Sequence, residues 1–544
     1  MTSLFAATLK SEKFGIWHWI AILTLGMLFA AIPGFMLAPY SINSFDEPYQ
    51  ILNAYDWENA IYAPLSSRLA NWFGNAVGWK YLAFRYLALA LNFTAIYITA
   101  MFALICSNRK RKIVVWSVIF TLLGLTFKTM TGYYGWDNWT ACFLASCIIL
   151  FFSLADRFTW GKLLLLGAMC GLTILMRIPN MSLLFFGVIL LALISKSKNR
   201  TATVLVFILT VLTVDFLVVS WLYGDFSNYL NLFKTLSINS HNPEKIVRPF
   251  FTRFALVMIF SALFYLGFRW LKIKSGSGQN RLFLISCVLT LVFTLSLLPS
   301  IGASFGMGPA YSYGIILFSL IFLFKRGVQK KDRKLTDKLL ILFILSTVTA
   351  IGSNVGFTKV LIWPVLPLII YLLENRFSRS LNILFYCWAS AYFIYSIIGI
   401  TQYNYMDEKI GRLSYRFNDK ESVLYGMHTT PEQGEFITEI YRDVKSYEEK
   451  GFRLIVLKQG NDYLYEYLFG EVNRYQRHNF GNWYAFWDDE YIDAIRNDIN
   501  NADTPVIVLY RQWKGPDDMT PMLRMLETNA ECVIDKPGYS IWKK

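Results

Sequence analysis

The chain has 544 residues, of which 55% are hydrophobic and only 16% are charged. Soluble globular proteins usually carry about 25% charged residues, so this composition argues against an ordinary soluble enzyme. The formal net charge of +15 would suggest a nucleic-acid partner in a soluble chain. Here the excess Lys and Arg fall in short clusters between long apolar runs, so we expect an integral membrane protein with no nucleic-acid partner.

The first apolar run extends from Ile16 to Leu37 and follows Lys10 and Lys13. It is long enough to span a bilayer and too long for a typical signal-peptide core, so it predicts an uncleaved first helix. Further runs predict about thirteen membrane helices within residues 1–400. The clearest of these runs cover about residues 81–106, about 138–155, a pair joined at 177–180, and a run that ends near Tyr223.

Basic residues gather in alternate connections between the predicted helices. If the N-terminus is cytoplasmic, the even-numbered connections hold the clusters at 109–112, 157–162, 196–200, 269–281, 325–338 and 376–379. The odd-numbered connections, which include long loops at 38–80 and 224–253, are poorer in Lys and Arg. The positive-inside rule therefore predicts a cytoplasmic N-terminus and a C-terminal segment on the opposite side of the membrane.

Residues 401–544 differ in character, because charged, aromatic and apolar residues are mixed there. Short apolar runs at Arg453–Leu457 and 504–510 are suited to buried strands, and the aromatic segment 462–469 is a candidate helix. Thr-Pro-Glu-Gln at 430–433 is typical of a helix start, with a Thr cap, a first-turn Pro and a Gln at the capping-box position. The predicted fold is thus a polytopic α-helical membrane protein with a small extracytoplasmic α/β domain at its C-terminal end.

The first outer loop, residues 38–80, concentrates acidic and aromatic side chains. Asp46 and Glu47 lie a few residues beyond the first helix, and Tyr49 and Tyr62 follow in aromatic, amphipathic stretches that would lie flat at the membrane surface. A carboxylate within reach of a hydroxyl is what general base catalysis requires. The same pair is also typical of a solvated helix start, because Glu-Pro is a favourable first turn.

This loop resembles that of the GT-C class of membrane glycosyltransferases, in which an acidic pair after helix one precedes interfacial helices and an aromatic-Pro-Leu segment, here at 62–65. In layout the closest families are protein O-mannosyltransferases and lipid A aminoarabinose transferases. Gly-Trp-Asp-Asn-Trp at 135–139 resembles the second acidic site of the class, and Arg-Ile-Pro-Asn at 177–180 resembles an Arg-x-Pro-Asn turn of many bacterial members. One departure is that the Lys preceding Pro-Pro-Leu in aminoarabinose transferases is missing.

The resemblance implies an inverting transfer of a sugar from a polyprenyl-phosphate donor to a glycan, lipid or protein acceptor of the cell envelope. It places the chain in a bacterial cytoplasmic (inner) membrane among membrane lipids, with the C-terminal domain periplasmic or extracellular. Asp46 would be the catalytic base, Glu47 its partner and Asp137 a second acidic contact, while Arg177 and Lys359 would clamp the phosphate. The other substrate-binding candidates on the outer face are Lys128, Arg253, Tyr49, Tyr62 and His241.

Alternatives from other classes remain open at this stage. A transporter or lipid flippase would place charges near the bilayer midplane, where this chain has few, chiefly Arg85 and Asp215. An O-antigen polymerase or ligase would use one large late outer loop. A non-enzymatic scaffold would use the C-terminal tail, residues 401–544, as a binding module. The outer loops of residues 1–400 contain no Asp-x-Asp motif and the seven cysteines have no metal-ligand spacing, so no metal site is predicted. A divalent cation held by Asp46 and Glu47 stays open.

Overall fold

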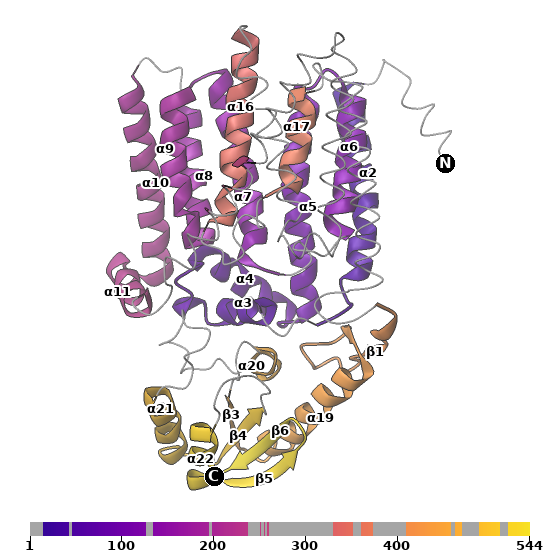
Figure 1. The fold of residues 1–544 in the computed structure, drawn as a ribbon, viewed down its shortest axis with the longest axis vertical. Helices are drawn as coiled ribbons and strands as arrows, with labels where there is room; N and C mark the ends of the chain where they lie inside the picture. Colours follow the sequence, from indigo (N-terminus) through magenta and orange to yellow (C-terminus); the bar gives the residue numbers. More distant parts are fainter. Residues whose placement is uncertain are drawn as a thin grey trace. The chain divides into compact units, whose positions relative to one another are not determined.

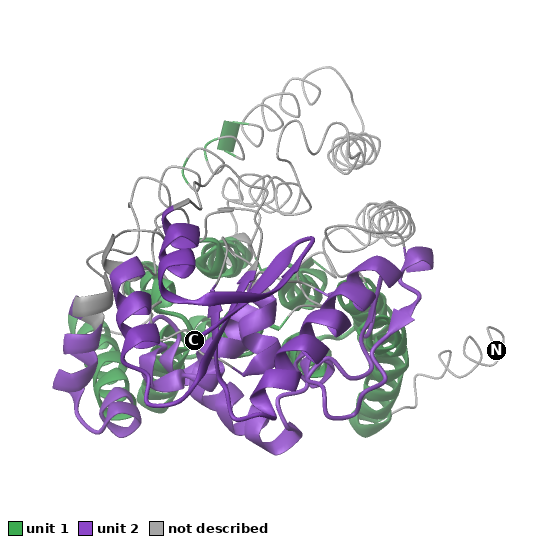
Figure 2. Ribbon diagram, turned by 90° about the horizontal axis from the view of Figure 1, so that it is seen from below, with its two compact units in different colours: residues 1–38, 86–218, 243–400 green, residues 39–85, 219–242, 401–544 purple. Residues whose placement is uncertain are grey.

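Helices dominate the described part of the chain (Figure 1). The computed structural model describes residues 15–42, 46–126, 134–194, 199–237, 330–351, 361–373, 410–457, 463–470, 489–511 and 520–544, with single positions between 251 and 259. The chain divides into two compact units (Figure 2). Unit 1 comprises residues 1–38, 86–218 and 243–400, and unit 2 comprises residues 39–85, 219–242 and 401–544.

The described residues of unit 1 form helices joined by short connections, and its longer helices run roughly along a common direction (Figure 1). They are α2 (Ile16–Leu37), α5 (Tyr81–Cys106), α6 (Lys110–Thr126), α7 (Trp136–Asp156), α8 (Trp160–Met176), α9 (Ser182–Ile194), α10 (Arg200–Tyr223), α16 (Lys330–Ser346) and α17 (Leu366–Leu373), with the short 3-10 helices η2 (Ile178–Met181), η3 (Val348–Ala350) and η5 (Trp363–Val365). The first turn of α5 and the last residues of α10 belong to unit 2.

Among the described residues, four helices are long and apolar enough to cross a bilayer, namely α2, α5, α7 and α10. The predicted runs 16–37 and 81–106 coincide with α2 and α5, the run 138–155 lies within α7, and α10 ends at Tyr223 as predicted. These four helix predictions are confirmed. The total of about thirteen also rests on residues outside the described ranges, so it stays a prediction.

Small residues allow the helices of unit 1 to approach closely. A Cβ atom added at Gly34 of α2 would lie 2.6 Å from the carbonyl oxygen of Leu125 in α6, which is closer than any real Cβ contact. Gly167 has the same role between α8 and α10, where an added Cβ would lie 2.7 Å from Cβ of Thr210. Apolar surroundings such as lipid give helices no hydrophobic driving force to associate. Small residues at the crossings let whole helix surfaces come into van der Waals contact, which stabilises the packing instead.

One predicted connection is partly helical. The basic run 325–338 was predicted to lie between helices, but α16 begins at Lys330, so that assignment is wrong from residue 330 onward. Lys338 is buried, and its Nζ lies 2.7 Å from Oδ2 of Asp156 at the end of α7 and 5.4 Å from the centroid of the Phe152 ring. A buried ammonium is tolerated where a carboxylate balances its charge, so the Asp156 contact explains how Lys338 can be buried within α16.

The tail of unit 2 contains a four-stranded mixed sheet with the strand order β3-β4-β6-β5. β3 (Arg453–Leu457) is parallel to β4 (Val506–Arg511), and β6 (Tyr539–Lys543) is antiparallel to both β4 and β5 (Glu531–Lys536). Helices α21 (Asp489–Asn500) and α22 (Thr520–Asn529) share an apolar core with this sheet. The strands predicted at 453–457 and 504–510 are therefore confirmed, the second with a shift of two residues at its start.

A second part of the tail consists of η6 (Ile410–Arg412), the short hairpin β1 (Tyr415–Arg416) and β2 (His428–Thr429), α19 (Pro431–Glu448) and α20 (Leu464–Phe469). The Thr430 side chain caps α19 by accepting from the backbone N–H of Gln433 at 3.3 Å, as the sequence predicted. The Gln433 side chain instead bonds the hydroxyl of Thr429, so the reciprocal half of the capping box is not formed.

α19 is joined to the β5–β6 hairpin by a polar cluster. Lys536 Nζ lies 2.7 Å from Asp443 Oδ2 and 2.8 Å from Glu439 Oε1, and the hydroxyl of Tyr539 donates to Asp443 Oδ2 at 2.6 Å. These carboxylates raise the pKa of Lys536, so the cluster stays ion-paired at neutral pH.

The rest of unit 2 is built from short helices that come directly before or after membrane-length helices in the sequence. They are α3 (Asp46–Tyr55), the 3-10 helix η1 (Trp57–Asn59), α4 (Pro64–Val77) and α11 (Phe226–Ser237). α3 and α4 pack against each other, and each carries polar and apolar residues on different faces. This amphipathic character is typical of helices that lie in the plane of a membrane surface.

Candidate functional site

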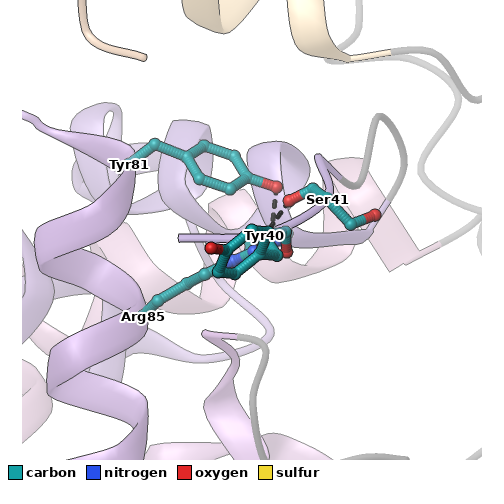
Figure 3. Close-up of polar contacts among 5 residues, drawn as sticks. Tyr40, Ser41, Tyr81 and Arg85 are labelled. Carbon is teal, nitrogen blue, oxygen red and sulfur yellow. Dashed lines mark hydrogen bonds and ion pairs between the residues drawn. The ribbon is translucent and has the colours of Figure 1, made fainter. Parts of the chain in front are cut away.

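Glu47, the second residue of α3, is completely buried. Its carboxylate accepts a hydrogen bond from the Tyr81 hydroxyl at 2.6 Å and hydrogen bonds from Nε and Nη2 of Arg85 at 3.1 and 2.9 Å, all to Oε2. Tyr81 and Arg85 are four residues apart at the start of α5 and therefore lie on one face of it. Figure 3 shows both side chains reaching from α5 toward the same point.

The same guanidinium also holds the segment that follows α2. Nη1 of Arg85 donates to the backbone carbonyl oxygens of Tyr40 at 3.0 Å and Ser41 at 2.8 Å (Figure 3). Ser41 has a φ of 67°, in the left-handed region that non-glycine residues rarely adopt. Arg85 thus joins three pieces of chain at one buried point, and its hydrogen bonds stabilise an unfavourable backbone conformation there.

These contacts show a structural role for Glu47, one member of the predicted acidic pair. The Glu47 carboxylate is enclosed and its charge is balanced by Arg85, which suits it to fixing the start of α3. Asp46 is the first residue of that helix and comes directly before Glu47. Glu47 is therefore a positioning residue of the predicted acidic pair, and the catalytic role of Asp46 stays a prediction.

The C-terminal tail contacts the end of the first loop, at Lys80 and Tyr81. The ammonium of Lys80 donates to the carbonyl oxygens of residues 420, 421 and 422 at 2.6, 3.1 and 3.0 Å. The next residue, Tyr81, donates its backbone N–H to the carbonyl oxygen of Val423 at 2.9 Å. The start of α5, which carries both partners of Glu47, is thus tied to the tail by backbone acceptors.

α20 of the tail packs against α3 and covers the Glu47 site. The Tyr467 ring lies 5.7 Å from the Tyr81 ring, and its hydroxyl donates to the carbonyl oxygen of Trp79. Burial raises the pKa of Tyr467 well above its ordinary value, and the negative charge of Glu47 raises it further. The ring of Tyr49, a predicted substrate-binding residue, has its centroid 4.8 Å from that of the Tyr463 ring beside α20.

His428 connects the tail to the segment that Arg85 holds. Its ring lies 4.8 Å from the Tyr40 ring, and its backbone N–H donates to the carbonyl oxygen of Pro39 at 2.8 Å. Burial lowers the pKa of His428 below its ordinary 6.5, and the positive charge of Arg416 lowers it further.

This lowered pKa predicts a pH-dependent stability. As the pH falls below about 6.5, the unfolded chain takes up a proton on His428 before the folded chain does, so stability is full above that pH and is lost on acidification. We expect His428→Asn to lose less thermal stability than the unmodified protein between about pH 7.5 and 5.5, measured by thermal unfolding of the full chain. His18→Asn serves as the control, and an unchanged pH response in His428→Asn would contradict the assignment.

Unit 1 contains a second candidate centre, formed by Asp137 and Arg177. Nη1 of Arg177 donates to Oδ1 of Asp137 and to the backbone carbonyl oxygen of Thr349, both at 3.0 Å. The Arg177 side chain is 9% exposed, whereas that of Asp137 is 38% exposed. The structure therefore brings together two predicted site residues that are forty positions apart in sequence, and leaves the acid accessible.

Local hydrogen bonds explain how this pair is formed. The Asn138 side chain accepts from the backbone N–H of Gly135 at 2.6 Å and so fixes the first turn of α7, which carries Asp137. In η2, the Nδ2 group of Asn180 donates to Thr140 Oγ1 at 3.0 Å and to the carbonyl oxygen of Thr173 at 2.8 Å. The Arg-x-Pro-Asn turn is thus tied to α7 and α8, which aims Arg177 at the start of α7.

The remaining predicted residues divide into two groups. Tyr62 is half-buried in the loop between η1 and α4. Lys128, Lys359, Arg253 and His241 lie outside the described residues. Within the described ranges, no group of three or more His, Cys, Asp or Glu side chains could hold a metal ion.

Tyr81 and Arg85 are site residues that the sequence analysis did not assign. A signal for Arg85 was present, because a charge inside an otherwise apolar helix requires a partner and is often functional. Its partner could not be chosen from sequence, since Asp46, Glu47, Asp56 and Glu58 all precede it within one loop.

Together these features define a helical protein with membrane-length helices and two acid–arginine centres at helix ends. No protein-family model matches the chain, and no curated protein is significantly similar to it in sequence.

Proposed function

We propose that the chain is a GT-C-class glycosyltransferase of the bacterial cytoplasmic membrane, which moves a sugar from a polyprenyl phosphate to a cell-envelope glycan, lipid or protein. The observation that carries the proposal is the buried contact of Glu47 with Arg85 and Tyr81. This contact fixes the start of α3, and with it the acidic residue Asp46, directly after a membrane-length helix. The base in such a reaction has to lie near the membrane surface, because the phosphate of the lipid donor lies there and the acceptor arrives from water.

The proposed reaction is a single displacement. Asp46 takes the proton of the acceptor hydroxyl, whose oxygen attacks the anomeric carbon on the face opposite the phosphate. A new carbon–oxygen bond forms as the bond to the phosphate oxygen breaks, so the configuration inverts and the polyprenyl phosphate leaves with the bonding electrons. The leaving phosphate gains negative charge, which cationic donors must stabilise. The sequence prediction that Asp137 and Arg177 contact substrate is kept as part of this proposal, and their pair in unit 1 is partly exposed.

The proposed topology places the N-terminus in the cytoplasm and the tail outside it. The tail and the loop after α2 lie in one compact unit and share hydrogen bonds through Lys80 and Tyr81, which supports placing both on one side. Two segments on one side must be separated by an even number of crossings. In the predicted arrangement of roughly thirteen helices, every helix but the first lies between them, which meets this condition.

Disrupting the gene tests the proposed activity and identifies the donor. A transferase that has lost its function leaves its donor unused, so one prenyl-phosphate sugar is expected to accumulate while one envelope glycan loses that sugar. Mass spectrometry of extracted lipids and envelope glycans would measure both changes, and restoring the intact gene should reverse them. Unchanged lipid-linked sugars and unchanged glycans would contradict the proposal.

A further inference from the structure

Arg68 of α4 occupies an unusual position in unit 2. Its guanidinium carbon lies 3.9 Å from the centroid of the Trp57 ring in η1 and 5.3 Å from that of Trp72, one turn further along α4. The two indole rings therefore hold the guanidinium by cation–π contact. This group was not among the cations that the sequence analysis proposed for phosphate.

The surrounding residues form an aromatic cluster at the end of a membrane-length helix. Trp72 contacts Trp221 at 5.9 Å, and Trp57 contacts Tyr223 at 6.2 Å, both near the end of α10. The exposed fractions of Trp72 and Trp221 are 46% and 61%. Exposed Trp side chains at the end of an apolar helix are typical of the headgroup level of a bilayer, which would place Arg68 at the depth of lipid phosphates.

Arg68 has no anionic partner within the described ranges. Its guanidinium makes the two cation–π contacts, and it makes neither an ion pair nor a hydrogen bond with another described residue. The nearest acid in sequence, Glu58 of η1, is exposed and does not pair with it. In the same cluster, the Tyr223 hydroxyl is buried and has no hydrogen-bond partner in the described part of the chain.

We propose that Arg68, held between Trp57 and Trp72, binds the phosphate group of a membrane lipid. A guanidinium carries five N–H donors in a planar fork that matches phosphate oxygens, and those of Arg68 make no hydrogen bond within the described part of the chain. By contrast, the guanidinium of Arg177 is already engaged by Asp137 and a backbone carbonyl. Taking the lipid to be the polyprenyl phosphate rests on the proposed function, whereas the phosphate site rests on Arg68 alone.

Lipid titrations of the detergent-purified full chain, followed by native mass spectrometry, test the site. The probes are farnesyl phosphate, farnesol and dioleoylphosphatidylglycerol. We expect Arg68→Gln to weaken farnesyl phosphate binding by about 10-fold or more, because it removes a charge-assisted contact. The farnesyl phosphate affinity of Arg68→Lys should lie between those of Arg68→Gln and the unmodified chain. Neither substitution should change the binding of farnesol, which has no phosphate. Arg524→Gln, which removes an exposed arginine of α22, is the matched control.

The outcomes separate this site from the proposed function. Equal farnesyl phosphate binding by Arg68→Gln and the unmodified chain would overturn the site, even if sugar transfer is found. Arg68-dependent binding without any sugar transfer would keep the site and reject the transferase. Preference for farnesyl phosphate over phosphatidylglycerol would identify the donor lipid as the source of the phosphate, and equal competition would identify bulk phospholipid.

Discussion

Replacing Asp46 with Asn is expected to lower sugar transfer by about 10²- to 10⁴-fold, the usual contribution of a general base. The amide has nearly the same size as the carboxylate but cannot take the proton of the acceptor hydroxyl. Because Glu47 and Arg85 make the buried contacts that fix α3, the folded structure should persist without the Asp46 charge. Initial rates of the purified protein in lipid nanodiscs, with the donor that accumulates on gene disruption, would measure the loss.

Glu432→Gln provides a matched control for this substitution. Glu432 is an exposed carboxylate in the first turn of α19, so its replacement makes the same kind of charge change at the same kind of helix position. We expect Glu432→Gln to retain full transfer and Asp46→Asn to unfold at the temperature of the unmodified chain. Transfer by Asp46→Asn within about two-fold of the unmodified rate would exclude Asp46 as the base, since a lost general base costs far more.

The membrane-length helices were predictable from the sequence because their boundaries are determined locally. α2 and α5 match the predicted runs residue for residue, since long apolar segments end where charged or polar residues begin. α16 shows where this reasoning failed. Lys338 of this helix is buried beside Asp156 of α7, and that contact joins residues that are far apart in sequence.

The candidate site was predictable in its residue types and much less in its contacts. Sequence drew attention to Glu47, Asp137 and Arg177, but it could not show that Glu47 is enclosed by Arg85 or that Arg177 contacts Asp137. The attachment of the tail to the first loop gave no signal at all. Its acceptors are backbone carbonyls at residues 420–422, which any sequence would provide equally.

The structure instead predicts a large stability effect at Arg85. Replacing Arg85 with Met is expected to destabilise the folded chain by about 3–5 kcal/mol, because it leaves the Glu47 carboxylate buried without its counter-charge. The substitution also removes the donors to the carbonyl oxygens of Tyr40 and Ser41. Thermal or denaturant unfolding of the full chain in detergent would measure the loss. Arg109→Met, at an exposed arginine just before α6, is the matched control and should cost little.

A double substitution tests whether the loss comes from the unpaired charge. Glu47→Gln combined with Arg85→Met removes both charges, so the double variant should be more stable than Arg85→Met alone, and the two single effects should not add. Equal stability of Arg85→Met and the unmodified chain would mean that the pair does not hold the start of α3. In that case the Glu47–Arg85 contact would not position Asp46, and the structure would no longer support Asp46 as the base.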